Sequence, residues 1–139
     1  MKKFTVVLLV LLMCISLCAC GKSEEATHAD ETIAAIGQVT EKSLSQIERA
    51  EKEVDNLSEK DVQSLDNLTM LYDARAAYNQ LMADNTEELI AAIGQPSHES
   101  LPLIEKARAA YEELDKEIKN LVENYDVLEE AEAGYKQVL

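Results

Sequence analysis

The sequence contains one unit twice, and this repeat limits the available folds more than any other feature. Shifted by 57 residues, the chain aligns with itself without a gap, and 18 of the 50 pairs formed by residues 33–82 and 90–139 are identical. Six of these identities are consecutive, in residues 33–38 and 90–95. A repeat of this length is typically a supersecondary unit that buries its apolar face against a neighbouring copy.

We therefore expect two tandem units in an all-α fold, the first over residues 30–84 and the second over residues 85–139. In both, apolar residues recur at steps of three and four, which lays one apolar stripe along a helix. The middle stripe consists of Leu44, Ile47, Ala50, Val54 and Leu57 in the first unit, and of Leu101, Ile104, Ala107, Tyr111 and Leu114 in the second. No strand-like alternation of useful length is present, so we expect about five antiparallel helices.

The predicted helix ends fall at equivalent places in the two units. Gly37 and Gly94 follow the first apolar segment, where a glycine can take the left-handed conformation that ends a helix. Ser43 and Ser100 stand before the middle helix and are candidate N-caps.

Later boundaries leave alternatives open. Ser58 and Asp115 are cap-type residues at a second break. Asn67 and Asn124 either cap a restarted helix or lie on a polar helix face. The last helix of the first unit either ends before the second unit or runs through residues 87–88 into it.

The first 19 residues have the order of a secretory signal peptide. Two lysines are followed by an uncharged run over residues 4–17, which is shorter than the roughly 20 residues of a membrane-spanning helix. Residues 17–20, Leu-Cys-Ala-Cys, resemble the lipobox of bacterial lipoproteins. This resemblance implies cleavage between Ala19 and Cys20 and acylation of Cys20, which would anchor the chain at the extracytoplasmic face of the cell membrane. The alternative is an ordinary secretory signal cut after Ala19.

The chain that follows the signal is acidic, which excludes some partners. Removing residues 1–19 takes away two lysines and no acid, so the formal charge moves from −14 to −16. Nucleic acid binding needs Lys and Arg to neutralise phosphates, so we expect no nucleic-acid partner. Every cysteine lies at or before Cys20, so the folded part has neither a disulfide nor a cysteine ligand. We expect residues 20–29 to be the lipidated cysteine and a short polar tether.

The repeat resembles a helical repeat common in surface proteins of Gram-positive bacteria. The second unit carries the fuller match, in Ile104, Ala107, Tyr111, Leu114, Leu121, Val122, Asn124, Tyr125, Leu128, Ala131 and Tyr135. The first unit keeps Val39 and Thr40 of the pattern but has Val54 and Leu68 where the second has tyrosines. The resemblance implies a spacer or accessory module, and it assigns no catalytic or ligand-binding residue.

Candidate chemistry is sparse. Glu25 and His28 have the Glu-x-x-His spacing that, used twice on facing helices, holds a di-metal centre. Here it occurs once, in the expected tether, and His98 is not its repeat equivalent. Acid pairs such as 112–113 fall on predicted helix surfaces. No nucleophilic serine turn is present, so we expect no catalytic residue, no metal site and no cofactor.

Tyr72 is the one candidate for partner contact. Its equivalent in the second unit is Glu129, so its position tolerates solvent, whereas the other tyrosines are expected in the core or at its edge. We expect a non-enzymatic, membrane-anchored interaction or spacer module at the cell surface, whose partner is an exported protein or a cell-wall component. The alternatives are a ligand-binding accessory lipoprotein of a transport or cell-wall system, and an inhibitor or chaperone of another exported protein.

Overall fold

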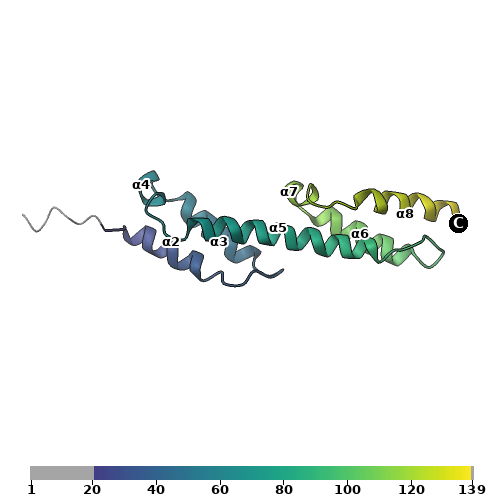
Figure 1. The fold of residues 1–139 in the computed structure, drawn as a ribbon, viewed down its shortest axis with the longest axis horizontal. Helices are drawn as coiled ribbons and strands as arrows, with labels where there is room; N and C mark the ends of the chain where they lie inside the picture. The colour runs from purple at the N-terminus through teal and green to yellow at the C-terminus, as the bar shows by residue number, and fades with distance from the viewer. Residues whose placement is uncertain (1–20, 139) are drawn as a thin grey trace, which may run out of the picture.

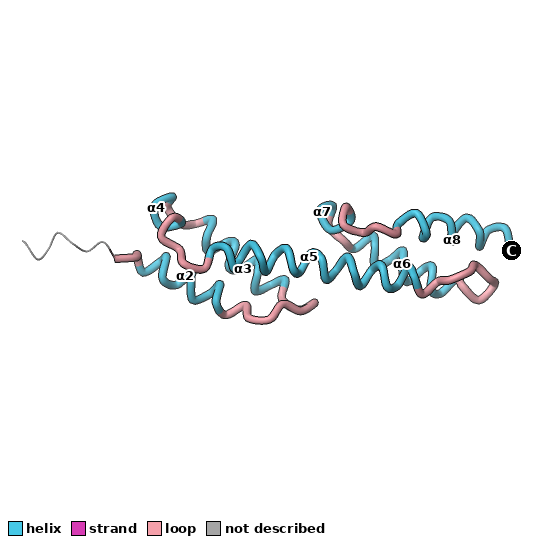
Figure 2. The backbone as a smooth tube through the Cα atoms, viewed as in Figure 1, coloured by secondary structure: helices cyan, strands magenta, loops and turns pink. Residues whose placement is uncertain are grey.

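The computed structural model describes residues 21–138, so the expected signal peptide, Ala19 and Cys20 lie outside the described residues. Every regular element in 21–138 is a helix, and that part contains no strand (Figure 1, Figure 2). The longer helices are α2 (Glu24–Ala34), α3 (Leu44–Asp55), α5 (Leu68–Ala91), α6 (Leu101–Glu113) and α8 (Tyr125–Val138). Two single-turn helices, α4 (Glu59–Val62) and α7 (Lys116–Lys119), lie between them. The predicted all-α class is confirmed.

The helices form two three-helix bundles that share α5. In the first bundle, α2, α3 and α5 pack against one another, and in the second, α5, α6 and α8 do the same. The two bundles follow one another along the long axis of the molecule, with α2 starting near one end and α8 finishing at the other (Figure 1). With 24 residues, α5 is roughly 36 Å long at 1.5 Å per residue. The boundary expected between residues 84 and 85 therefore falls inside one continuous helix.

The tether predicted for residues 20–29 is largely a helix. α2 begins at Glu24, and the Ser23 hydroxyl caps it by accepting a hydrogen bond from the Ala26 N–H at 3.0 Å. Ala26 and Ala29 are buried against the bundle. The prediction was wrong because the buried face of this turn consists of alanines, which an apolar pattern of larger residues does not detect.

The turn before each middle helix has the same hydrogen bonds in both bundles. Gly37 and Gly94 both have a φ of 61°, as predicted for residues that end a helix. The candidate caps act differently from the prediction. The hydroxyls of Ser43 and Ser100 reach back and accept from the N–H groups of Thr40 (2.9 Å) and Ser97 (3.0 Å).

Thr40 and Ser97 complete these turns from the other side. Their hydroxyls accept from the N–H groups of Lys42 and Glu99, each at 3.3 Å. Ser43 and Ser100 therefore stand at the N-cap positions of α3 and α6, as predicted, but their hydroxyls cap no N–H group of the helix and instead close the turn before it.

Asn67 and Asn124 occupy the starts of α5 and α8, but neither side chain caps its own helix there. The Asn67 amide donates to the backbone carbonyl oxygen of Asp30 at 3.2 Å, and the Asn124 amide donates to that of Glu87 at 3.1 Å. Each asparagine thus joins the start of the third helix of its bundle to the first helix. Among the other predicted caps, the Ser58 hydroxyl accepts from the Asp61 N–H at 3.2 Å, whereas Asp115 makes no such bond.

One apolar core runs through both bundles. Its largest fully buried side chains are Ile33, Ile47, Leu71, Ile90 and Leu128, and they belong to one continuous cluster. Burying an aliphatic side chain of this size contributes about 1.5–3 kcal/mol. The core is therefore continuous along α5, which lies in both bundles.

Candidate functional site: the groove between the two bundles

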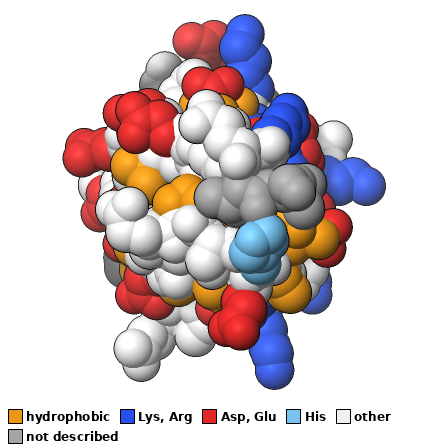
Figure 3. Space-filling view, turned by 90° about the vertical axis from the view of Figure 1, so that its right-hand side faces the viewer, with side chains coloured by type: hydrophobic (Ala, Val, Ile, Leu, Met, Phe, Trp, Pro, Cys, Tyr) orange, Lys and Arg blue, Asp and Glu red, His pale blue; other side chains and the backbone are white. Residues whose placement is uncertain are grey.

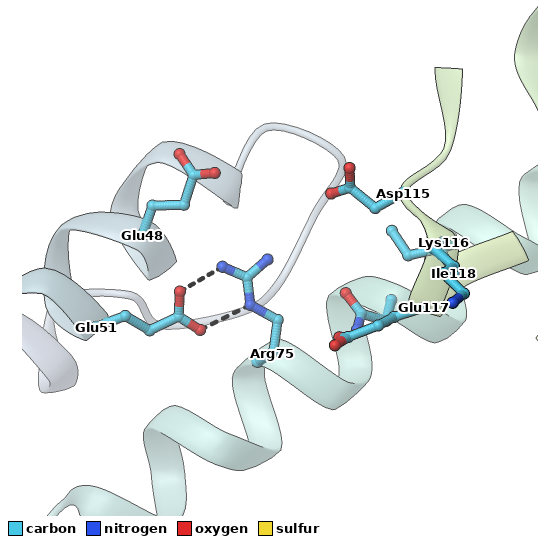
Figure 4. Close-up of a pocket in the computed structure, with 8 residues that line it drawn as sticks. Glu48, Glu51, Arg75, Asp115, Lys116, Glu117 and Ile118 are labelled. Atoms are coloured by element: carbon cyan, nitrogen blue, oxygen red, sulfur yellow. Dashed lines mark hydrogen bonds and ion pairs between the residues drawn. The ribbon is translucent and has the colours of Figure 1, made fainter. Parts of the chain in front are cut away.

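An open groove of about 530 Å³ lies where the second bundle meets the first. Its lining comes from α3 (Glu48 and Glu51), α5 (Arg75 and Asn79) and the turn at α7 (Asp115, Lys116, Glu117 and Ile118). Figure 4 shows the α7 residues facing Arg75 across the opening, with Glu48 and Glu51 on the opposite side. Because both bundles line it, the shape of this groove depends on how they are joined.

Arg75 is held by Glu51 and is not free to bind a ligand. Its guanidinium donates from Nε to Glu51 Oε1 at 2.7 Å and from Nη2 to Glu51 Oε2 at 2.5 Å (Figure 4). These hydrogen bonds raise the pKa of Arg75 despite its partial burial. Two parallel hydrogen bonds fix a guanidinium in both position and orientation, so Arg75 braces α5 against α3.

The second bundle has the same brace with the charges exchanged. Arg108 and Glu132 stand 57 residues after Glu51 and Arg75, and their bidentate hydrogen bonds measure 2.7 and 2.8 Å. The carboxylate of Glu132 and the hydroxyl of Tyr125 raise the pKa of Arg108. An ion pair that recurs with its acid and base exchanged stabilises the packing of the helices. A site that binds a charged ligand would instead keep the same charge at equivalent positions in both bundles.

Three other carboxylates give the groove its charge. Glu48, Asp115 and Glu117 make no ion pair within 4.0 Å with any described residue, and neither does Lys116. The groove therefore favours cationic groups. Its carboxylates line an open groove rather than a desolvated pocket of the kind that tunes a general acid or base.

The Glu25–His28 pair lies on α2 beside another small groove of about 300 Å³, lined also by Glu53. His28 Nδ1 is 3.5 Å from Glu53 Oε2 and 3.2 Å from the Thr32 hydroxyl oxygen. Hydrogen bonding, first from Thr32 and then from Arg49, lowers the pKa of Glu53 although its burial opposes this. Within residues 21–138, no three His, Cys, Asp or Glu side chains are grouped so that they could hold a metal ion.

Tyr72 is 62 % exposed on α5, so this candidate contact residue lies on the surface. Tyr78 is buried, as expected. Tyr111 and Tyr125 stack with their ring centroids 4.3 Å apart. Arg108 lies over the Tyr125 ring and Lys119 lies over the Tyr111 ring, so the stacked pair is already covered by cations of its own bundle.

Sequence reasoning missed the polar cluster at the amino-terminal end of the first bundle. The Asp30 carboxylate, almost fully buried, accepts from the backbone N–H groups of Asp66 (3.1 Å) and Asn67 (2.9 Å) and from the Lys22 ammonium. Lys22 also donates to the Asp66 carboxylate at 2.8 Å. The sequence signal was the repeat itself, because Asp30 and Glu87 are equivalent acids, and the Glu87 carboxylate accepts from the Glu123 N–H at 2.6 Å.

Comparison with protein-family models, with curated proteins and with solved structures gives no match. In the part of the chain that the structure describes, no helix has the length and apolar character needed to cross a membrane.

Proposed function

We propose that this protein is an extracytoplasmic lipoprotein, anchored to the cell membrane through Cys20, whose helical rod acts as a non-enzymatic interaction or spacer module at the cell surface. The two bundles are tandem repeats of one unit, joined by a helix that both use. The observation that carries the proposal is the elongated arrangement of the bundles along α5, with the start of α2 near one end and the end of α8 at the other (Figure 1).

A shared helix suits a spacer. Two domains joined by a flexible linker move independently, but here the connection is the middle of α5, and its buried residues Ala83 and Thr86 lie there. Bending the rod would break backbone hydrogen bonds of α5 and open the continuous core. Such a rod keeps its second bundle at a fixed distance from its first.

The folded part of the chain begins only a few residues after the proposed lipid anchor at Cys20. Lys22, two residues after Cys20, is fixed to Asp30 and Asp66, and α2 begins at Glu24. Only a few residues therefore separate the proposed lipid from the first bundle. The amino-terminal end of the rod would lie at the membrane and the second bundle away from it.

Detergent partition of cells expressing Cys20→Ser tests the anchor. We expect the wild-type protein in the detergent phase and the variant in the aqueous phase or retained as full-length precursor, because two acyl chains give stable anchoring where one is marginal. Cys18→Ser is the matched control, since it removes a neighbouring thiol and leaves Cys20, and it should partition like the wild type. Equal partition of Cys20→Ser and the wild type would contradict the proposal.

The groove between the bundles favours one alternative, a ligand-binding accessory lipoprotein of a transport or cell-wall system. Its volume of about 530 Å³ is that of a small-molecule site. However, its lining is charged and open, and its arginine is engaged by Glu51. Equilibrium dialysis with small cationic solutes would test this alternative, and retention that Glu48→Gln abolishes would support it.

A further inference from the structure

The outer side of the first half of α5 is an exposed helix surface that carries little charge. We define this α5 face by its exposed residues, which are Thr69, Met70, Tyr72, Asp73, Ala76, Ala77 and Gln80. Asp73 is the one charged residue of the face, in a chain whose formal charge is −14. Tyr72 is 62 % exposed and Met70 is 40 % exposed, at surface positions where a polar side chain would also fit.

The equivalent surface of α8 provides an internal comparison. The residues 57 positions later are Asp126, Val127, Glu129, Glu130, Ala133, Gly134 and Gln137, and all but Gly134 are also exposed. Three of these residues are acidic where the α5 face has one acid. The same helix position therefore carries more negative charge in the second bundle, and the first bundle has an exposed tyrosine there, whereas Val127 is exposed to the same degree as Met70. Depletion of charge and enrichment of tyrosine and methionine are typical of the centre of a protein interface.

The two edges of the α5 face differ in character. One edge is an apolar groove of about 240 Å³, lined by Ile36, Val39, Met70 and Ala77 among others. At the equivalent place in the second bundle, Pro96 and Gly134 stand where Val39 and Ala77 line this groove, and Pro96 lies against Gly134.

The other edge is acidic. Tyr72 precedes Arg75 and Asn79 by three and seven residues, so it lies on the same side of α5 as these lining residues of the groove between the bundles. Beyond them stand three carboxylates without an ion pair to any described residue, those of Glu48, Asp115 and Glu117, together with one such cation, Lys116. A partner that covers Tyr72 thus meets unpaired carboxylates along one flank.

We propose that the α5 face is a docking surface for an amphipathic helix of another protein, whose apolar stripe packs on Ala76 between Met70 at one edge of the face and Tyr72 at the other, with Lys or Arg along the flank beside Tyr72. The apolar groove receives one side chain of the stripe, as in other helix-in-groove complexes. The acidic edge determines which flank of the partner helix faces it, because unlike charges across an interface favour one orientation. This proposal rests on the proposed role as an interaction module and names its partner's chemistry.

A synthetic peptide tests it without the natural partner. The probe is an amphipathic helix of about 18 residues, long enough to be partly helical alone, with Leu and Ala on one face and Lys on the flanks. It is titrated into the full chain in detergent at about 0.15 M salt, where exposed charges are screened beyond about 8 Å. We expect saturable binding, and at least about tenfold weaker binding to Tyr72→Glu, which copies the second bundle and removes the aromatic anchor.

The matched control separates docking from general attraction of a basic peptide to an acidic protein. Gln137→Glu adds the same charge to the equivalent α8 surface, and its affinity should stay within about twofold of the wild type. General attraction instead predicts that both variants bind the peptide as tightly as the wild type or tighter, and that result would overturn the proposal. So would a lack of binding to the wild type, or equal binding of the counterpart peptide with Glu in place of Lys.

Two further measurements test whether the variants are folded and whether the chain binds to itself. Circular dichroism should show unchanged helix content for Tyr72→Glu, because the side chain is exposed, and Met70→Asp provides a second variant of the same face with the same expected loss. Self-association of the full chain that Tyr72→Glu abolishes would assign the face to a second copy and overturn the proposal. Because the titration is done in detergent, its result is independent of the Cys20 partition test.

Discussion

Gly134 of α8 lies against the ring of Pro96, so a methyl group on its Cα would stand 3.0 Å from Pro96 Cγ and 3.3 Å from Pro96 Cβ. The equivalent positions in the first bundle hold Ala77 and Val39. Glycine therefore faces proline in the second bundle, and alanine and valine hold the two positions in the first. A proline at one position is accommodated by the loss of a methyl group at the other.

Gly134→Ala tests this pairing. Alanine is favoured over glycine inside a helix by about 0.5–1 kcal/mol, but here contact with Pro96 should cancel that gain or reverse it. The double variant Pro96→Val with Gly134→Ala reproduces the first bundle and should recover about 1 kcal/mol relative to Gly134→Ala alone. Urea unfolding measures both. Additive effects of the two substitutions would show that the residues do not interact energetically.

The exchanged ion pairs make a second prediction. Arg75→Glu places two carboxylates together at the partly buried contact of α3 with α5 and should lower the free energy of unfolding by about 1 kcal/mol or more. Adding Glu51→Arg restores the pair with the polarity seen in Arg108–Glu132 and should bring the stability close to that of the wild type. Arg49→Glu is the control, because Arg49 is 66 % exposed and exposed pairs contribute little. A double variant no more stable than Arg75→Glu would contradict the role assigned to this brace.

Asp30 should make the stability of the first bundle depend on acid pH. Burial by itself raises the pKa of Asp30, but hydrogen bonds from Lys22 and from the Asn67 and Asp66 N–H groups outweigh it and leave the pKa below its ordinary value. The stabilisation is therefore fully present above the unfolded-state pKa of about 3.9 and is lost as the pH falls from there through the lower folded-state pKa.

Asp30→Asn should lower the free energy of unfolding by about 2 kcal/mol at pH 7, the scale of hydrogen bonds to a charged group. The difference from the wild type should shrink as the pH falls below about 4. Asp66→Asn is the control and should have a small effect, because the Asp66 side chain is 85 % exposed. A difference between Asp30→Asn and the wild type that is the same at pH 7 and pH 3 would count against the assignment.

The shared helix predicts one cooperative unfolding transition for both bundles. Asp84→Pro removes a backbone donor in the middle of α5 and clashes with the carbonyl of residue 80, at a cost of about 3 kcal/mol. We expect this variant to unfold in two transitions, whereas Asp84→Ala, which keeps the helix, should retain one. Two transitions in the wild type would mean that the bundles fold independently.

The sequence predicted the elements whose physical signal is local. Gly37 and Gly94 end helices because a left-handed residue favours glycine, and Leu71 and Leu128 are buried because they continue an apolar stripe. Both features depend on residue type and spacing alone, so they can be predicted without a structure.

Features that depend on contacts between distant residues could not be predicted in this way. Glu51 and Arg108 count as a mismatch when the two units are aligned, although each belongs to the equivalent brace of its own bundle. The hydroxyls of Ser43 and Ser100 bond backwards to the N–H groups of Thr40 and Ser97, whereas the first N–H groups of α3 and α6 bond to the backbone carbonyl oxygens of these serines. The start of α2 was missed because alanine is too small to mark a buried face. Tyr72 was predicted as a surface residue from its equivalence to Glu129, but the grooves on either side of it became visible only in the fold.

Attachment to a membrane through Cys20 decides where the proposed rod acts. Mass spectrometry of the amino-terminal peptide, from protein purified out of the membrane fraction, tests it most directly. We predict a peptide that begins at Cys20, continues Gly21-Lys22, and carries the added mass of a diacylglyceryl group. A peptide that begins at Met1, or an unmodified peptide that begins at Cys20, would contradict it.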